Sequence, residues 1–271
     1  MIFLEFSIYQ EGFLSENDDY NFLKFFSEYS HEKRGIEFTY SNKNFEELKS
    51  LLPEKYFTME NFENEFHFQK ELMFWVCRSL NQEENEDIIP VRPLNGATIL
   101  QETFTNRVSS NCQMYAVLLN ELFLSFNFKS RMITCLPMDL RFSDCHCVTL
   151  VFSSIYNKWI VFDPAMCTFY TNEKKEPLNI SEMRKMLIEQ KQIYLPFIPR
   201  KRSRHLLSYL VKNFVRFNCY QCSEYNIDDS AKDKIIYCLN PRCFPLTDKI
   251  IQKNDHIVKI IHTSNEEEFW K

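Results

Sequence analysis

The spacing of apolar residues changes about halfway along the chain. In the first part they recur every three or four positions, which is typical of amphipathic helices. This spacing predicts helices at 16–29, 44–52, 62–80 and 97–106. From Met114 to Leu124 nearly every position is apolar, which predicts a buried central helix over 111–126. Short runs rich in β-branched and aromatic residues follow and predict strands at 130–137, 145–152 and 158–163.

This order of elements indicates an α+β fold in which the central helix packs against an antiparallel sheet. A further helix is expected at 180–190, before a tail of mixed pattern. We therefore divide the chain into an N-terminal helical addition (1–61), a core (62–199) and a C-terminal extension packed on that core (200–271).

The composition is that of a globular protein, with 45% hydrophobic residues and 26 phenylalanines. Only three glycines are present, so a glycine-rich loop that binds the phosphates of a nucleotide is not expected, and we predict no cofactor. The net charge of −5 disfavours nucleic acid as a partner. The one basic run, at 200–204, is interpreted as a solvated loop before the next helix.

The first residues show no targeting or membrane signal. They lack a basic segment, and Glu5 interrupts their apolar run. Elsewhere no apolar run approaches the roughly 18 residues that a membrane span needs. We expect a soluble cytoplasmic protein without a membrane partner, in which the ten cysteines stay reduced.

Cys112 stands at the predicted start of the central helix. Backbone N–H groups and the helix dipole at such a position favour the thiolate, which is the nucleophilic form of cysteine. Cysteine is also a common buried residue, so Cys112 could equally be the first core position of the helix. The helix start alone does not decide between these interpretations.

The two following strands bring a histidine and an aspartate within reach of each other. His146 shares a strand face with Val148, whereas Cys145 and Cys147 point to the other face. A hairpin loop at 153–156 would place His146 opposite Asp163, about 5 Å apart at Cβ, and a loop at 154–157 would make them diagonal neighbours about 7–8 Å apart. A core histidine satisfied by a carboxylate is the alternative.

These residues suit a nucleophile, a general base and acid, and a group that orients the imidazole. The segment resembles the transglutaminase-like superfamily of cysteine enzymes, a compact relative of the papain fold. The resemblance rests on Asn111-Cys112-Gln113, on His146 at the start of a strand, and on Trp159-x-x-x-Asp163-Pro164. It implies a Cys112-His146-Asp163 triad. Two family features are absent, namely a glycine before the cysteine and a tryptophan two residues after the histidine, where this chain has Val148.

The expected activity is acyl transfer through a thioester, with an amide or peptide bond of a peptide or protein as substrate. Hydrolysis is favoured over transamidation because water needs no second organised substrate site. The alternatives are a transglutaminase that cross-links or deamidates proteins and a scaffold of the same superfamily that binds a partner without chemistry.

Four cysteines near the C-terminus approximate the spacing of a zinc site. They form the pairs Cys219-x2-Cys222 and Cys238-x4-Cys243. The second pair is irregularly spaced, and the glycines that let a zinc knuckle turn are missing. We therefore predict that these cysteines bind no zinc, and that the chain has no metal site.

Overall fold

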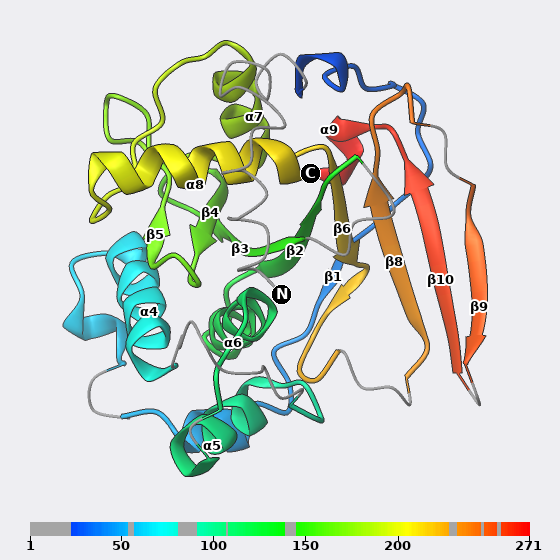
Figure 1. Cartoon of the computed structure of the whole chain (residues 1–271). Coiled ribbons are helices and arrows are strands. Elements are labelled where there is room, and N and C mark those ends of the chain that lie inside the picture. The colour runs from blue at the N-terminus through cyan, green and yellow to red at the C-terminus, as the bar shows by residue number, and fades with distance from the viewer. Residues whose placement is uncertain are drawn as a thin grey trace.

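Eight strands form one mixed sheet across the molecule (Figure 1). The computed structural model describes residues 23–53, 57–80, 91–106, 108–138, 145–227, 232–244, 247–253 and 256–271. Along the sheet the strands are β5 (Thr168–Phe169), β4 (Lys158–Asp163), β3 (His146–Ser153), β2 (Ser130–Leu136), β6 (Arg216–Tyr220), β8 (Lys234–Leu239), β10 (His256–Thr263) and β9 (Lys249–Lys253). Neighbouring strands are antiparallel except β8 and β10, and a separate parallel pair joins β1 (Thr39–Tyr40) to β7 (Cys222–Ser223).

Helices cover both faces of the β2–β5 part of the sheet. One layer contains α4 (Glu65–Ser79), α5 (Gly96–Asn106) and α6 (Cys112–Ser125), with the short α3 (Glu46–Ser50) and the 3₁₀ turn Met59–Asn61 beside them. The other layer contains α7 (Ile180–Ile188) and α8 (Arg200–Asn213), and α9 (Glu266–Phe269) packs into the same core. The chain thus has a mixed α+β fold with an antiparallel-dominated sheet.

The alternation of side chains in the strands explains why both faces are covered. In β4, Ile160 and Phe162 pack toward α6, whereas Trp159 and Val161 pack toward α7 and α8. Every one of these four side chains is buried. A strand with apolar residues on both faces needs a layer of helices on each side, and the two helical layers supply it.

Asparagine side chains cap the starts of five of the described helices. Asn64, Asn95, Asn111, Asn179 and Asn265 each accept a hydrogen bond from a backbone N–H of the first turn. The helices expected at 44–52, 62–80, 97–106, 111–126 and 180–190 are confirmed with ends shifted by a few residues. The helix expected at 16–29 lies largely outside the described residues, and positions 23–25 are helical.

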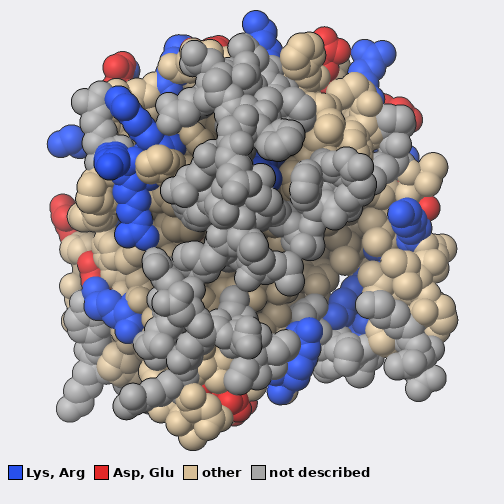
Figure 2. Space-filling view, in the orientation of Figure 1, with Lys and Arg blue, Asp and Glu red and all other residues tan. Residues whose placement is uncertain are grey.

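The basic run at 200–204 belongs to α8, so its interpretation as a loop is wrong. Leu206 and Leu210 are buried on one side of this helix, whereas Lys201, Arg202 and Arg204 are exposed. Burial of these leucines on one side stabilises the whole helix, including the first turns that carry the basic residues. Figure 2 shows Lys and Arg side chains around the left-hand end of α8.

The C-terminal region continues the sheet that the central region begins. β6 pairs with β2, and β8, β10 and β9 extend the sheet outward from β6. The three-part division of the chain stays a prediction. Among the described residues, no helix combines the length and the apolar character that crossing a membrane requires.

Candidate active site

Cys112 is the first residue of α6, directly after the capping Asn111. The residue is 7% exposed, and its sulfur lies 4.0 Å from the carbonyl oxygen of Cys145, the residue before β3. One turn further along α6, the hydroxyl of Thr149 in β3 donates a hydrogen bond to the Ala116 carbonyl at 3.1 Å. The helix start is therefore fixed against the start of β3.

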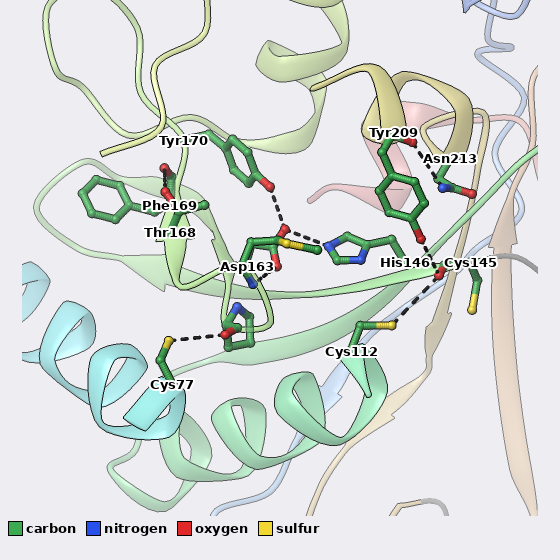
Figure 3. Close-up of polar contacts among 12 residues, drawn as sticks. Cys77, Cys112, Cys145, His146, Asp163, Thr168, Phe169, Tyr170, Tyr209 and Asn213 are labelled. Atoms are coloured by element: carbon green, nitrogen blue, oxygen red, sulfur yellow. Dashed lines mark hydrogen bonds and ion pairs between the residues drawn. The ribbon is translucent and has the colours of Figure 1, made fainter. Parts of the chain in front are cut away.

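The hairpin of β3 and β4 brings His146 and Asp163 together. Ser153 pairs with Lys158 and Thr149 with Phe162, which is the register of the loop at 154–157. The two side chains are therefore diagonal neighbours, and His146 Nε2 lies 2.7 Å from Asp163 Oδ2 (Figure 3). Both side chains are almost completely buried.

Two further groups hold the Asp163 carboxylate. The Tyr170 hydroxyl donates to the same Oδ2 at 2.6 Å, and the Met166 backbone N–H donates to Oδ1 at 3.2 Å. Tyr170 follows β5, which pairs with β4 so that Thr168 lies beside Asp163. Sequence reasoning missed Tyr170. The turn that begins at Asp163-Pro164 was the available signal. A chain that reverses there runs back along β4 and brings the residues after the turn, including Tyr170, close to Asp163.

The electrostatics of the site favour a thiolate at Cys112 and a charged imidazole at His146. A hydrogen bond with the Cys147 thiol lowers the pKa of Cys112 most strongly, and His146 lowers it further through a hydrogen bond and its charge, so burial is outweighed. Burial opposes protonation of His146, but the charge and hydrogen bond of Asp163, together with Cys112, raise its pKa well above the usual value. Because Nε2 is bound to Asp163, Nδ1 is the ring nitrogen left for the thiol.

Cys147 and Tyr209 complete the surroundings of this pair. Cys147 is buried in the core on the α6 side, and its hydrogen bond with Cys112 raises the pKa of the Cys147 thiol well above the usual value. Tyr209 of α8 donates to the Cys145 carbonyl at 3.2 Å, and its ring stands edge-on to His146 at 5.6 Å between centroids. The sequence did not indicate Tyr209, because its proximity depends on how α8 packs.

The cysteines considered for zinc lie on separate elements. Cys219 and Cys238 are buried on the neighbouring strands β6 and β8, Cys222 lies in β7, and Cys243 is exposed in a loop. Within the described part of the chain, no three or more His, Cys, Asp and Glu side chains form a group that could hold a metal ion. The absence of a zinc site stays a prediction.

Comparisons with known proteins leave the family open. No family model matches the chain, and no curated protein sequence matches it either. Among solved structures, the chain is similar to "a Putative Cysteine Protease from Cytophaga hutchinsonii", with 20% identity and a TM-score of 0.29. The similarity covers 40% of this chain and about a third, 34%, of that one. The chemistry of the site has to be derived from its own residues.

Proposed function

We propose that this protein is a cysteine-dependent acyl-transfer enzyme that hydrolyses an amide or peptide bond. Cys112 is the nucleophile, His146 the general base and acid, and Asp163 the group that orients the imidazole. The observation that carries the proposal is the 2.7 Å hydrogen bond between His146 and Asp163, formed beside a cysteine that begins a helix.

The reaction would begin from the charged pair. The Cys112 thiolate attacks the amide carbonyl carbon, and the charged oxygen that develops is stabilised by the Cys112 backbone N–H, which has no partner within the helix. His146 then gives its proton to the leaving amine as the C–N bond breaks, leaving a thioester. In the second half, neutral His146 takes a proton from water, and the hydroxide equivalent cleaves the thioester to release the acid.

The resemblance of Cys112, His146 and Asp163 to the transglutaminase-like superfamily supports this assignment and its papain-like chemistry. We favour water as the acyl acceptor because an amine acceptor would need a second binding site. A peptide or protein amide is the substrate class, since a thioester route suits an amide carbonyl.

Alkylation of Cys112 tests the activated thiol. Since Cys112 is only 7% exposed, the small reagent iodoacetamide is appropriate. At pH 6, where an ordinary thiol of pKa about 8.5 is protonated, Cys112 should be alkylated faster than the exposed Cys243. The change His146→Ala should remove this advantage. If Cys243 reacts faster and His146→Ala changes nothing, the thiol is not activated.

Acyl-enzyme formation tests the chemistry itself. Incubation with p-nitrophenyl acetate should add one acetyl group to Cys112, detected by peptide mass spectrometry. The variant Cys112→Ala should show no acetylated cysteine, whereas Cys243→Ala is the matched control and should react like the parent protein. Acetylation that persists unchanged in Cys112→Ala would place the nucleophile elsewhere.

A further inference from the structure

Two cysteines outside the proposed triad meet at the turn that follows Asp163. Cys77 lies near the end of α4, and its sulfur is 3.3 Å from the Pro164 carbonyl oxygen (Figure 3). The same oxygen accepts the backbone N–H of Cys167 at 3.3 Å. One carbonyl therefore holds the Cys77 thiol and the Cys167 backbone together, although the two residues are far apart in the sequence.

Both side chains are reachable from solvent. Cys77 and Cys167 are each partly exposed, in contrast to the buried Cys135, Cys219 and Cys238. Cys167 also has a left-handed backbone with φ of 52°, which belongs to the tight turn that returns the chain from β4 to β5. A small oxidant can thus reach the pair without the fold opening.

The two thiols have unequal acidity, as a nucleophile and a resolving thiol require. The hydrogen bond between them is the largest influence on both: it raises the pKa of Cys77 and lowers the pKa of Cys167. The nearby Arg78 also lowers the pKa of Cys167, whereas burial opposes the change. Of the two thiols, Cys167 therefore loses its proton more readily than Cys77, which makes it the more reactive sulfur.

We propose that Cys77 and Cys167 are a peroxide-sensitive pair that forms a reversible disulfide. The Cys167 thiolate attacks one oxygen of hydrogen peroxide and the O–O bond breaks, giving a sulfenic acid and hydroxide. The Cys77 sulfur then attacks the Cys167 sulfur, and the sulfenic oxygen leaves as water once it has taken up the Cys77 proton. Overall, two thiols and one peroxide give one disulfide and two waters.

The bond would join α4 to the turn that holds the Asp163 carboxylate. The Met166 N–H that donates to Asp163 Oδ1 lies inside this turn, directly before Cys167. A link at Cys167 would therefore restrict the turn. The disulfide itself does not depend on the function proposed above, because neither sulfur belongs to the triad.

Peptide mapping tests the proposal in a Cys112→Ala background, which removes the other acidic thiol. The protein is treated with increasing hydrogen peroxide, the remaining thiols are blocked with N-ethylmaleimide, and the digest is analysed without reductant. A peptide linking Cys77 to Cys167 should appear first and disappear with dithiothreitol. The buried Cys219 and Cys238 on neighbouring strands form the control pair, and their linked peptide should be at least about ten-fold less abundant, because both are buried and the register, with Cys238 opposite Asn218, directs them to opposite faces of the sheet.

Two single variants separate the roles of the sulfurs. In Cys77→Ser, Cys167 should be trapped as a sulfenic acid by dimedone and no cross-link should form. In Cys167→Ser, Cys77 should stay reduced at the same dose, because burial raises the pKa of its thiol. Thermal melting checks that both variants fold. The proposal fails if peroxide oxidises the exposed Cys243 while Cys77 and Cys167 remain reduced or become linked to other cysteines.

Discussion

The change Tyr170→Phe removes one hydrogen bond from the proposed triad and keeps the aromatic ring. The lost hydroxyl donates to Asp163 Oδ2 at 2.6 Å, the oxygen that also binds His146 at 2.7 Å. Tyr170 is completely buried. Among the described residues, the donor that remains besides His146 is the Met166 N–H on Oδ1.

The size of the effect follows from the kind of hydrogen bond. A bond to a charged acceptor contributes about 1.5–3 kcal/mol, so the free energy of unfolding should fall by about this amount. Without the hydroxyl the carboxylate can rotate, and misplacement of the imidazole should slow acylation of Cys112 by roughly ten- to a hundred-fold.

The pH profile distinguishes a positioning role from a structural one. The charge of Asp163 raises the pKa of His146 against the effect of burial. The Tyr170 hydrogen bond offsets part of that charge, so its loss should raise the pKa of His146 further. The high-pH limb of the rate profile, where the imidazolium loses its proton, should therefore move to higher pH in Tyr170→Phe.

The assay is the rate of Cys112 acetylation by p-nitrophenyl acetate from pH 5 to pH 10, with urea unfolding measured on the same samples. Tyr225→Phe is the matched control, because the Tyr225 hydroxyl also contacts a carboxylate, that of Glu47 at 3.5 Å, in an exposed place. It should leave rate and profile unchanged. The reasoning is refuted if Tyr170→Phe lowers stability but keeps both the acetylation rate and the high-pH limb of the parent protein. The hydroxyl would then not position the proposed triad.

Three other predictions concern the triad and the core. His146→Ala with Asp163→Asn should slow acetylation little more than His146→Ala alone, because the two residues act as a unit; additive losses would contradict this. Burial raises the pKa of Glu121 to about 8 against the hydrogen bonds from Gly96 and Asn226. Folding thus favours the neutral form of Glu121. The free energy of unfolding should therefore fall as pH rises from about 4.5 to 8, by at most about 4–5 kcal/mol. Urea unfolding of Glu121→Gln, measured over the same pH range, should show a weaker dependence of this free energy on pH. Gly96→Ala should lower the melting temperature, at a cost of about 1–3 kcal/mol, because its Cβ would meet Glu121 Oε2 at 3.0 Å and Leu118 Cδ1 at 3.1 Å; an unchanged melting temperature would show that these side chains move aside.

Local patterns were sufficient to predict much of the fold around the site. The apolar run after Cys112 predicts α6, and alternation predicts β3 and β4, because these signals lie within single elements. A single hairpin brings His146 and Asp163 together. Only two positions of its loop had to be considered, and the observed register is that of the loop at 154–157. The catalytic role of the three residues stays a proposal.

Contacts between distant elements could not be predicted in this way. Tyr209 reaches the Cys145 carbonyl because α8 crosses the sheet, and Cys77 reaches Pro164 because α4 packs beside the turn. The insertion of β6 beside β2 likewise depends on non-local pairing. Periodicity reports which face of an element is buried, but it carries no information about which other element covers that face.

The position of the site follows from the two layers of the sheet. Cys112 and Cys147 belong to the core on the α6 side, whereas Tyr170 belongs to the core beneath α7 and α8. His146 alternates with Cys147 along β3, so its side chain leaves the strand toward the second layer, where Asp163 binds it and Tyr170 in turn binds Asp163. The proposed nucleophile and its proposed base therefore come from opposite layers, and they can meet only where β3 begins and the sheet no longer separates them. The proposal thus fits Cys112 as the first residue of α6, because one turn further along the helix Ala116 already packs on Thr149 in the body of the strand.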